Sequence, residues 1–450
     1  MDKAREVALK ILYKIDEEKA YSNIVLDEML NINRKILNEK DIGLISEIVY
    51  GVTTWRLTLD AIIKKYSTIK IKKISPWILN ILRMSVYQIV FLDKIPKSAA
   101  VNEGVNLAKR YGHKSSSGFV NAILRKISKD DYNELFKIQN QKERLSKITS
   151  IPEWMIEELS NDGLAWGKIE EICNSSNIRP KISIRVNKIK TSKEQLKIKL
   201  EQKGINVEEG ILEDFLVLNK VKNIEKLEEF KEGLFTIQDE AAGLTALILD
   251  PNINDNILDA CSSPGGKTTY IAEIVENSAN VEAWDIHEHR TKLVEQNAKR
   301  LGITAIKEKV QDATKNIEEY HEKFDKILLD VPCLGIGVLK RKPDIKWQRK
   351  KEDIKEITKL QYDILNNCAK YLKKDGKMVY STCSIFKEEN IEIVNKFLNE
   401  NSEFELEKIK LPSYSNRENY FQRFLINEQI LQVYQNEKTD GFFMCKIKRK

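Results

Sequence analysis

The chain has 450 residues, 42% of them apolar and 32% charged, with a formal net charge of +7. This length exceeds one ordinary hydrophobic core and predicts about two to four domains, and the composition excludes a disordered chain. No apolar run reaches the roughly 18 residues that cross a bilayer, and the N-terminus resembles an amphipathic helix more than a signal peptide, so we expect a cytoplasmic protein without a membrane partner.

Residues 1–130 read as consecutive helices. Apolar residues recur at helical spacing from Val7 to Ile15 and from Ile42 to Val49, and Pro76 begins a further helix. This segment holds 23 lysines and arginines against 14 acidic residues, an excess of +9 that leaves −2 for the rest of the chain. We therefore predict an all-α bundle that meets the phosphate backbone of a nucleic acid; a solvated lysine-rich surface is the alternative.

The next two segments are shorter. Residues 131–165 are polar and helical, and we predict that they form a connector. The alternation of Ile182, Ile184 and Val186 predicts a strand, residues 192–203 a helix, and residues 215–218 a second strand. We expect residues 166–232 to form a small α+β domain.

Residues 233–450 alternate short apolar strands with helical stretches. The predicted strands lie at 257–260, 281–284, 326–329 and 378–380. Strands that alternate with helices predict a parallel, doubly wound, Rossmann-like α/β domain. Folds of this kind bind ligands at the edge where the strands end, so the residues that follow the strands are the candidates for a site.

A glycine-bearing turn follows the first of these strands and precedes a helix. Its end, Gly266-Lys267-Thr268, matches the end of a nucleotide P-loop, but that motif needs a glycine where this chain has Cys261. The spacing therefore excludes a P-loop. Small residues in such a turn still let a cofactor approach the backbone.

Acidic residues follow the next two strands. Asp285 ends the second strand, twenty residues after Gly265, where a carboxylate accepts hydrogen bonds from the ribose of an adenosine-containing cofactor. Asp312 follows the next strand, within reach of an adenine edge. Either residue alone is typical of a turn or a helix cap, but together they favour a cofactor site. These features do not distinguish S-adenosylmethionine from NAD.

Two of the six cysteines directly follow predicted strands. Asp330-Val331-Pro332-Cys333 closes one strand and Thr382-Cys383 follows another, whereas Cys173, Cys368 and Cys445 lack such a context and are expected to be structural. No C-x-x-C pair occurs, so neither a disulfide framework nor a zinc site is expected. His287 and His289 have no third ligand nearby, and we predict no metal.

The segment Cys261-Ser262-Ser263-Pro264-Gly265-Gly266-Lys267 resembles the first motif of the RNA cytosine-C5 methyltransferases. The resemblance implies S-adenosylmethionine as the cofactor, bound by this motif together with Asp285, Asp312 and Asp330. The FKEEN segment after Cys383 and the terminal DGFFMCKIKRK also resemble this family, and the helical front resembles the NusB-type RNA-binding fold. That combination is similar to the branch that methylates bacterial small-subunit (16S) ribosomal RNA, which implies this RNA as the partner.

The same resemblance implies the catalytic roles. Carbon 5 of cytosine is a poor nucleophile, and addition of a thiolate at carbon 6 activates it, which is covalent catalysis. In the RNA enzymes the Thr-Cys thiol, here Cys383, is the nucleophile, and the Pro-Cys thiol, here Cys333, assists release. Asp330 is expected near ring N3.

The segment LGIGVLKRKPDIKW after Cys333 also resembles the family. Four basic residues, Lys340, Arg341, Lys342 and Lys346, predict that it meets phosphates, and an exposed charged loop is the alternative.

Three alternatives remain open. A NAD-dependent oxidoreductase would share the fold and Asp285 but would not need both cysteine motifs. A non-catalytic RNA-binding assembly factor would explain only the basic front, and the same chemistry on another RNA, such as tRNA, is a third possibility. We expect a monomer.

Overall fold

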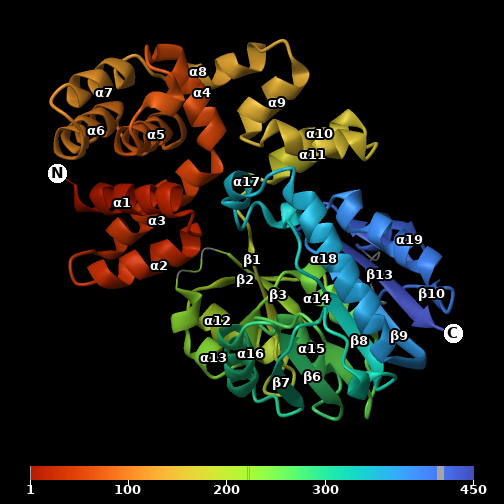
Figure 1. Cartoon of the computed structure of the whole chain (residues 1–450). Coiled ribbons are helices and arrows are strands. Elements are labelled where there is room, and N and C mark those ends of the chain that lie inside the picture. The colour runs from red at the N-terminus through yellow and green to blue at the C-terminus, as the bar shows by residue number, and fades with distance from the viewer. Residues whose placement is uncertain (1, 220, 222, 413–419) are drawn as a thin grey trace. The chain divides into compact units, whose positions relative to one another are not determined.

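The protein is described by a computed structural model that covers residues 2–219, 221, 223–412 and 420–450. The chain divides into two compact units (Figure 1). Unit 1 comprises residues 1–177 and 339–351, and unit 2 comprises residues 178–338 and 352–450. In the described residues no helix is both long and apolar enough to cross a membrane.

Unit 1 is helical throughout its described residues. The α-helices are α1 (Lys3–Glu18), α2 (Ser22–Asn33), α3 (Glu39–Thr54), α4 (Arg56–Tyr66), α5 (Pro76–Phe91), α6 (Lys97–Tyr111), α7 (Ser116–Leu124), α8 (Asp130–Glu134), α9 (Gln141–Thr149), α10 (Glu153–Asn161), α11 (Trp166–Ser175) and α17 (Ile345–Gln348). Local sequence sets several helix starts: the Asp2 side chain accepts a hydrogen bond from Arg5 N, and Pro76 is the first residue of α5. The apolar faces of α1 to α7 share one core that runs from residue 4 to residue 127.

Residues 339–351 lie in unit 1 although their neighbours in sequence belong to unit 2. Asp344 accepts a hydrogen bond from Ser22 Oγ at 2.6 Å, and Trp347 Nε1 donates to Thr53 O at 2.7 Å. The ammonium group of Lys346 donates to Asn177 Oδ1 at 2.7 Å and to Thr54 O at 3.2 Å. This segment is therefore a structural part of the helical unit.

The first part of unit 2 is the small α+β domain. It contains β1 (Ile182–Val186), α12 (Lys193–Gln202), β2 (Asn206–Glu209), β3 (Phe215–Asn219), α13 (Glu228–Lys231) and β4 (Phe235–Ile237). The strands form an antiparallel sheet in the order β2-β3-β1-β4. Its core gathers Ile184, Leu200, Leu216 and Phe235.

The second part of unit 2 is built on a larger sheet. Its strands are β5 (Asn256–Asp259), β6 (Asn280–Asp285), β7 (Ile306–Val310), β8 (Phe324–Asp330), β9 (Leu372–Thr382), β10 (Phe404–Glu407), β11 (Leu425–Asn427), β12 (Ile430–Val433) and β13 (Phe442–Arg449). The helices are α14 (Glu240–Leu249), α15 (Gly266–Ile274), α16 (Glu288–Leu301), α18 (Asp353–Cys368) and α19 (Ile391–Glu400). Short 3-10 turns throughout the chain are η1 (Ile71–Lys73), η2 (Leu135–Lys137), η3 (Ile224–Lys226), η4 (Glu318–Tyr320), η5 (Ile336–Val338), η6 (Ala369–Tyr371), η7 (Lys387–Glu389) and η8 (Gln422–Phe424).

The strand order is β11-β12-β13-β9-β8-β5-β6-β7, and β10 pairs with β13. Strands β5 to β9 are parallel, as the sequence predicted. Alternate residues of β8 enter different cores: Leu328 packs with α14 and α15, whereas Ile327 and Leu329 pack with α18 and α19. Helices thus cover both faces, which is the doubly wound arrangement.

The sequence did not predict the antiparallel half of this sheet. Strand β13 pairs with β9 in an antiparallel sense, with Cys445 opposite Tyr380, and it also pairs with β10 and β12. The first six residues of β13, Phe442 to Ile447, are all buried, so the strand lacks the period-two alternation of a half-exposed strand. The predicted multidomain fold class is confirmed, and the predicted boundaries at residues 130, 165 and 232 stay predictions.

Candidate active site

The carboxyl ends of the parallel strands bring the predicted site residues to one edge of the sheet. Asp259 at the end of β5 lies opposite Ala283 on β6 and Leu328 on β8. Asp330 at the end of β8 lies opposite Ser381 on β9. The loops that leave these strands carry the glycine turn and both cysteine motifs.

The glycine turn, residues 261–267, is fixed to the neighbouring strand end. Ser262 donates from both its backbone N and its Oγ to Trp284 O, at 2.8 and 2.9 Å, which places the turn beside Asp285. Gly265 has φ +97, and a Cβ atom there would lie 3.2 Å from Val294 Cα. Glycine is therefore required at this position by both its backbone conformation and the close approach of α16. Ser263 Oγ donates to Arg290 O, and Asn297 Nδ2 donates to Pro264 O.

Asp259, at the end of the strand that precedes the turn, accepts a hydrogen bond from Thr268 Oγ1 at 2.6 Å. Burial raises the pKa of Asp259 to about 7, since a desolvated carboxylate is unfavourable. The sequence did not single out this residue, because it is the last residue of an apolar strand and no motif marks it.

The acids predicted to bind the ribose and the adenine lie at the end of β6 and in the loop that follows β7. Asp285 is buried, accepts a hydrogen bond from His287 N at 3.1 Å and forms an ion pair with Arg290 Nε at 3.3 Å. Gln311 N donates to Asp285 O at 3.0 Å, so the loop that carries Asp312 lies beside the end of β6. Burial opposes ionisation of Asp312, but hydrogen bonds from Thr314 hold its pKa below the usual value. Both acids are thus held at the edge where a cofactor would bind.

Lys267 connects the glycine turn to the first cysteine motif. Its Nζ donates to Asp330 Oδ2 at 2.7 Å, and Asp330 Oδ1 accepts from Ser381 Oγ at 3.0 Å. Burial lowers the pKa of Lys267, but the charge and hydrogen bond of Asp330, together with the charge of Cys383, outweigh burial and raise it. An ammonium group is therefore maintained beside Asp330 and within electrostatic reach of Cys383.

The two candidate thiols are in direct contact. Cys333 Sγ and Cys383 Sγ are 2.9 Å apart, and both residues are partly accessible. The hydrogen bond with Cys383, followed by loss of solvent, raises the pKa of Cys333 well above its usual value. The hydrogen bond and burial therefore favour the protonated form of Cys333, and the contact joins the two sulfurs directly.

Glu389, the second glutamate of the FKEEN segment, holds the loops of both thiols. It is fully buried, and its Oε2 accepts hydrogen bonds from Leu334 N at 2.8 Å and from Gln361 Nε2 at 3.0 Å. Its Oε1 accepts from Ser384 Oγ. Leu334 directly follows Cys333 and Ser384 directly follows Cys383, so one carboxylate sets the positions of the two loops. The segment was recognised in the sequence, but this role was not.

The other four cysteines lie outside this pair. Cys173, Cys368 and Cys445 are buried, and burial raises the pKa of each thiol. Burial also raises the pKa of Cys261 well above its usual value. All four thiols are therefore poor nucleophiles, since the thiolate is the reactive form. In the described part of the chain, no group of three His, Cys, Asp or Glu residues could hold a metal, and His287 and His289 are exposed.

The prediction that Lys346 meets phosphates is wrong. Its side chain is 1% exposed and is hydrogen-bonded within unit 1. Burial lowers its pKa to about 7. The sequence pattern was misleading because it does not distinguish a lysine exposed to solvent from one that is buried as a hydrogen-bond donor. Lys342, in the same segment, is exposed.

The chain matches known protein families over most of its length. Residues 246–448 match the family model of the 16S rRNA methyltransferase RsmB/F, residues 2–129 that of the NusB family, and residues 151–225 that of the RsmF/B-like ferredoxin-like domain. A Bacillus subtilis protein named "Probable ribosomal RNA small subunit methyltransferase B" is 37% identical over 99% of this chain and 98% of its own length. The chain belongs to the RsmB/F family of 16S ribosomal RNA methyltransferases.

Other relatives and a solved structure agree with this membership. A "Ribosomal RNA small subunit methyltransferase B" of Shewanella oneidensis is 33% identical, covering 90% of this chain and 92% of its own. The crystal structure of PH0851 is 26% identical with a TM-score of 0.81, covering 100% of this chain and 99% of that one. The protein is therefore a methyltransferase with a NusB-like helical part, a small middle domain and a Rossmann-like catalytic part. Membership removes the oxidoreductase from the alternatives.

Proposed function

We propose that the protein methylates carbon 5 of a cytosine in small-subunit ribosomal RNA and that Cys383 forms a covalent bond with that base. The observation that carries this proposal is the contact of two partly accessible thiols, 2.9 Å apart, at the carboxyl edge of a methyltransferase sheet. A single nucleophile would not need a second thiol at this distance. The small-subunit ribosomal RNA is taken from the names of the relatives.

The two thiols have different roles. The thiolate of Cys383 would add to carbon 6, and the electron pair released toward carbon 5 would form a bond to the methyl carbon of the bound cofactor, as the bond from that carbon to the sulfonium sulfur breaks and the sulfur leaves as a neutral thioether. After the carbon 5 proton is lost to a base, the bond between Sγ and carbon 6 breaks and the thiolate of Cys383 leaves. Cys333 stays protonated and lies within hydrogen-bond distance, so it stabilises the leaving thiolate.

Asp330 and Lys267 place charged groups next to the proposed position of the cytosine ring. The carboxylate of Asp330 already accepts bonds from Lys267 and Ser381, but its two oxygens retain lone pairs for a further contact near ring N3.

The glycine turn, Asp285 and Asp312 fit S-adenosylmethionine. This cofactor, when bound, supplies an electrophilic methyl group. The turn at 261–267 permits close approach to its backbone, because Gly265 has no side chain and is held in a left-handed conformation. Asp285 and Asp312 provide carboxylates at adjacent strand ends for the ribose and the adenine.

The substrate is tested by giving the protein labelled S-adenosylmethionine with naked 16S ribosomal RNA, assembled small subunits and tRNA in separate reactions. We expect 5-methylcytosine at one position of the ribosomal RNA. Methylation of tRNA alone would replace the substrate, and methylation of another atom would overturn the proposed chemistry. Binding of ribosomal RNA without any transfer would favour an assembly factor.

The thiol roles are tested by the covalent adduct. Cys333→Ala should accumulate a denaturant-resistant complex with RNA that depends on the cofactor, because release is impaired. Cys383→Ala should give neither adduct nor methylation, and the double variant should lose the adduct, since groups that act in sequence are not additive. Cys173→Ala, a buried cysteine in unit 1, is the control and should behave like the wild type. An adduct in Cys383→Ala but not in Cys333→Ala would reverse the assignment.

A further inference from the structure

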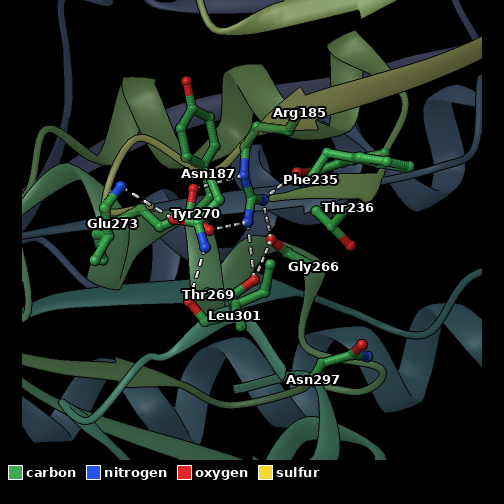
Figure 2. A network of polar contacts seen from close by, with 12 residues as sticks. Arg185, Asn187, Phe235, Thr236, Gly266, Thr269, Tyr270, Glu273, Asn297 and Leu301 are labelled. Atoms are coloured by element: carbon green, nitrogen blue, oxygen red, sulfur yellow. Dashed lines mark hydrogen bonds and ion pairs between the residues drawn. The ribbon is translucent and has the colours of Figure 1, made fainter. Parts of the chain in front are cut away.

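Arg185 lies on β1 of the small α+β domain, but its guanidinium group enters the catalytic part (Figure 2). The residue is 0% exposed. Nη1 donates to Gly266 O at 2.6 Å and also to Gln238 Oε1. Nη2 donates to Thr269 Oγ1 at 3.0 Å, so every one of these contacts lies at or beside the first turn of α15.

Two further contacts make the position of this guanidinium rigid. Glu273 accepts from Nε at 3.0 Å and from Nη2 at 2.8 Å, which is a bidentate ion pair. The ring of Tyr270 lies 4.6 Å from the guanidinium carbon. Figure 2 shows the guanidinium between Tyr270, Glu273 and the backbone of Gly266. A buried arginine with all these partners loses little conformational freedom on binding, and it can transmit a fixed geometry to the turn.

The contacts continue into the cofactor turn. Thr269 Oγ1 accepts from Arg185 and donates to Gly265 O at 2.7 Å, so it passes the constraint to the glycine with positive φ. Gly266, whose carbonyl Arg185 holds, directly precedes Lys267, which pairs with Asp330. Arg185 therefore holds Gly266 directly and Gly265 through Thr269, next to the lysine that pairs with Asp330.

We propose that Arg185 is a positioning residue that holds the turn at 261–267 in its cofactor-binding conformation, which makes the small α+β domain part of the cofactor site. The identity of the cofactor rests on the proposed function. The alternative is that Arg185 only joins the two parts of unit 2. Asn187 separates these cases, because it is also fully buried on the same segment and donates to Gly233 O and Leu301 O, away from the turn.

The test measures binding of S-adenosylmethionine to the full chain by calorimetry and the KM values for the cofactor and for RNA. Arg185→Lys should raise the Kd for the cofactor about tenfold, since it loses hydrogen bonds worth roughly 1.4 kcal/mol in total. At saturating cofactor its kcat should approach that of the wild type, and its KM for RNA should change by less than about twofold.

Two other variants complete the design. Thr269→Val removes the hydroxyl that joins Arg185 to Gly265 without leaving a buried charge, and should raise the Kd for the cofactor several-fold even if Arg185→Lys fails to fold. Asn187→Ala should lower the melting temperature but change that Kd by less than about twofold. Equal weakening by Asn187→Ala, or unchanged binding in Thr269→Val, would overturn the proposal. A wild type that binds the cofactor but methylates no RNA would overturn the proposed function alone.

Discussion

Glu389 accepts hydrogen bonds from residues on both thiol-bearing loops, so its removal should separate the two sulfurs without touching either. Glu389→Ala leaves Leu334 N and Ser384 Oγ without this acceptor, and each unpaired buried group costs about 1–3 kcal/mol. We expect kcat for methylation to fall roughly tenfold or more.

Glu389→Gln is the matched control. Its amide oxygen can still accept from Leu334 and Gln361, and its amide nitrogen can donate to the hydroxyl of Ser384, so most activity should remain. Equal loss in both variants would show that the negative charge matters rather than the positions of the loops.

Asp285→Ala should weaken binding of S-adenosylmethionine while RNA affinity is retained. Hydrogen bonds from ribose hydroxyls to a carboxylate are charge-assisted and worth roughly 1.5–3 kcal/mol, or about 10- to 150-fold in Kd. Calorimetry with the cofactor and filter binding with RNA measure the two affinities. A Kd for the cofactor equal to that of the wild type would remove Asp285 from the site.

Among single residues, the sequence identified the candidate site residues that directly follow a predicted strand. The glycine turn, Asp285, Asp330 and the two cysteines could be named because parallel strands end at one edge. Arg185 could not be found in this way. It stands between Ile184 and Val186 on a predicted strand, where no motif marks it, and the structure buries every residue from Ser183 to Val186.

Among the elements, the segment 339–351 differs most from its prediction, and Lys346 gives it a measurable pH dependence. Burial lowers the pKa of Lys346 to about 7, whereas an unfolded lysine titrates near pH 10.4. Between these values the unfolded chain binds more protons than the folded one, so the free energy of unfolding rises with pH across this window. Below pH 7 both states are protonated and the contribution of Lys346 no longer changes.

We expect the wild type to gain on the order of 2 kcal/mol relative to Lys346→Met between pH 7 and pH 9. Urea unfolding followed by tryptophan fluorescence measures the difference, since five of the six tryptophans lie in unit 1. Lys342→Met, at an exposed lysine of the same segment, should follow the wild type at both pH values. If Lys346→Met also shows the wild-type dependence, another group must titrate.

The helices and strands that could be predicted are those whose apolar residues recur in a clear pattern. The strands at β5, β6, β8 and β9 and the helices of the front part were recognised from alternation and helical spacing. Strand β13 and the return of residues 339–351 to the helical unit depend on contacts between distant segments, which periodicity does not encode.

For the whole molecule, the distribution of charge predicts how RNA binding responds to salt. Residues 1–130 carry an excess of +9, and Lys70, Lys72 and Lys73 are exposed around η1. Each lysine that contacts a phosphate contributes about 0.7–0.9 to the slope of log affinity against log salt. Replacing these three lysines with glutamine in the full chain should reduce the magnitude of that slope by up to about 2 to 3.

Titration of fluorescent RNA at several salt concentrations gives this slope. The control replaces Lys199, Lys299 and Lys307, which are exposed lysines of unit 2, and should leave the slope nearly unchanged. An equal decrease in both triple variants would mean that the basic excess at the front is only a solvated surface.

The return of residues 339–351 to unit 1 also bears on dividing the protein into fragments. A fragment of residues 1–177 lacks Asp344, Lys346 and Trp347, and therefore leaves Ser22, Thr53 and Asn177 without these partners. The fragment that begins at residue 178 carries the missing segment. We therefore expect two separately expressed halves to associate through residues 339–351, which begin six residues beyond Cys333. A cut at residue 177 is thus not expected to give two independent domains.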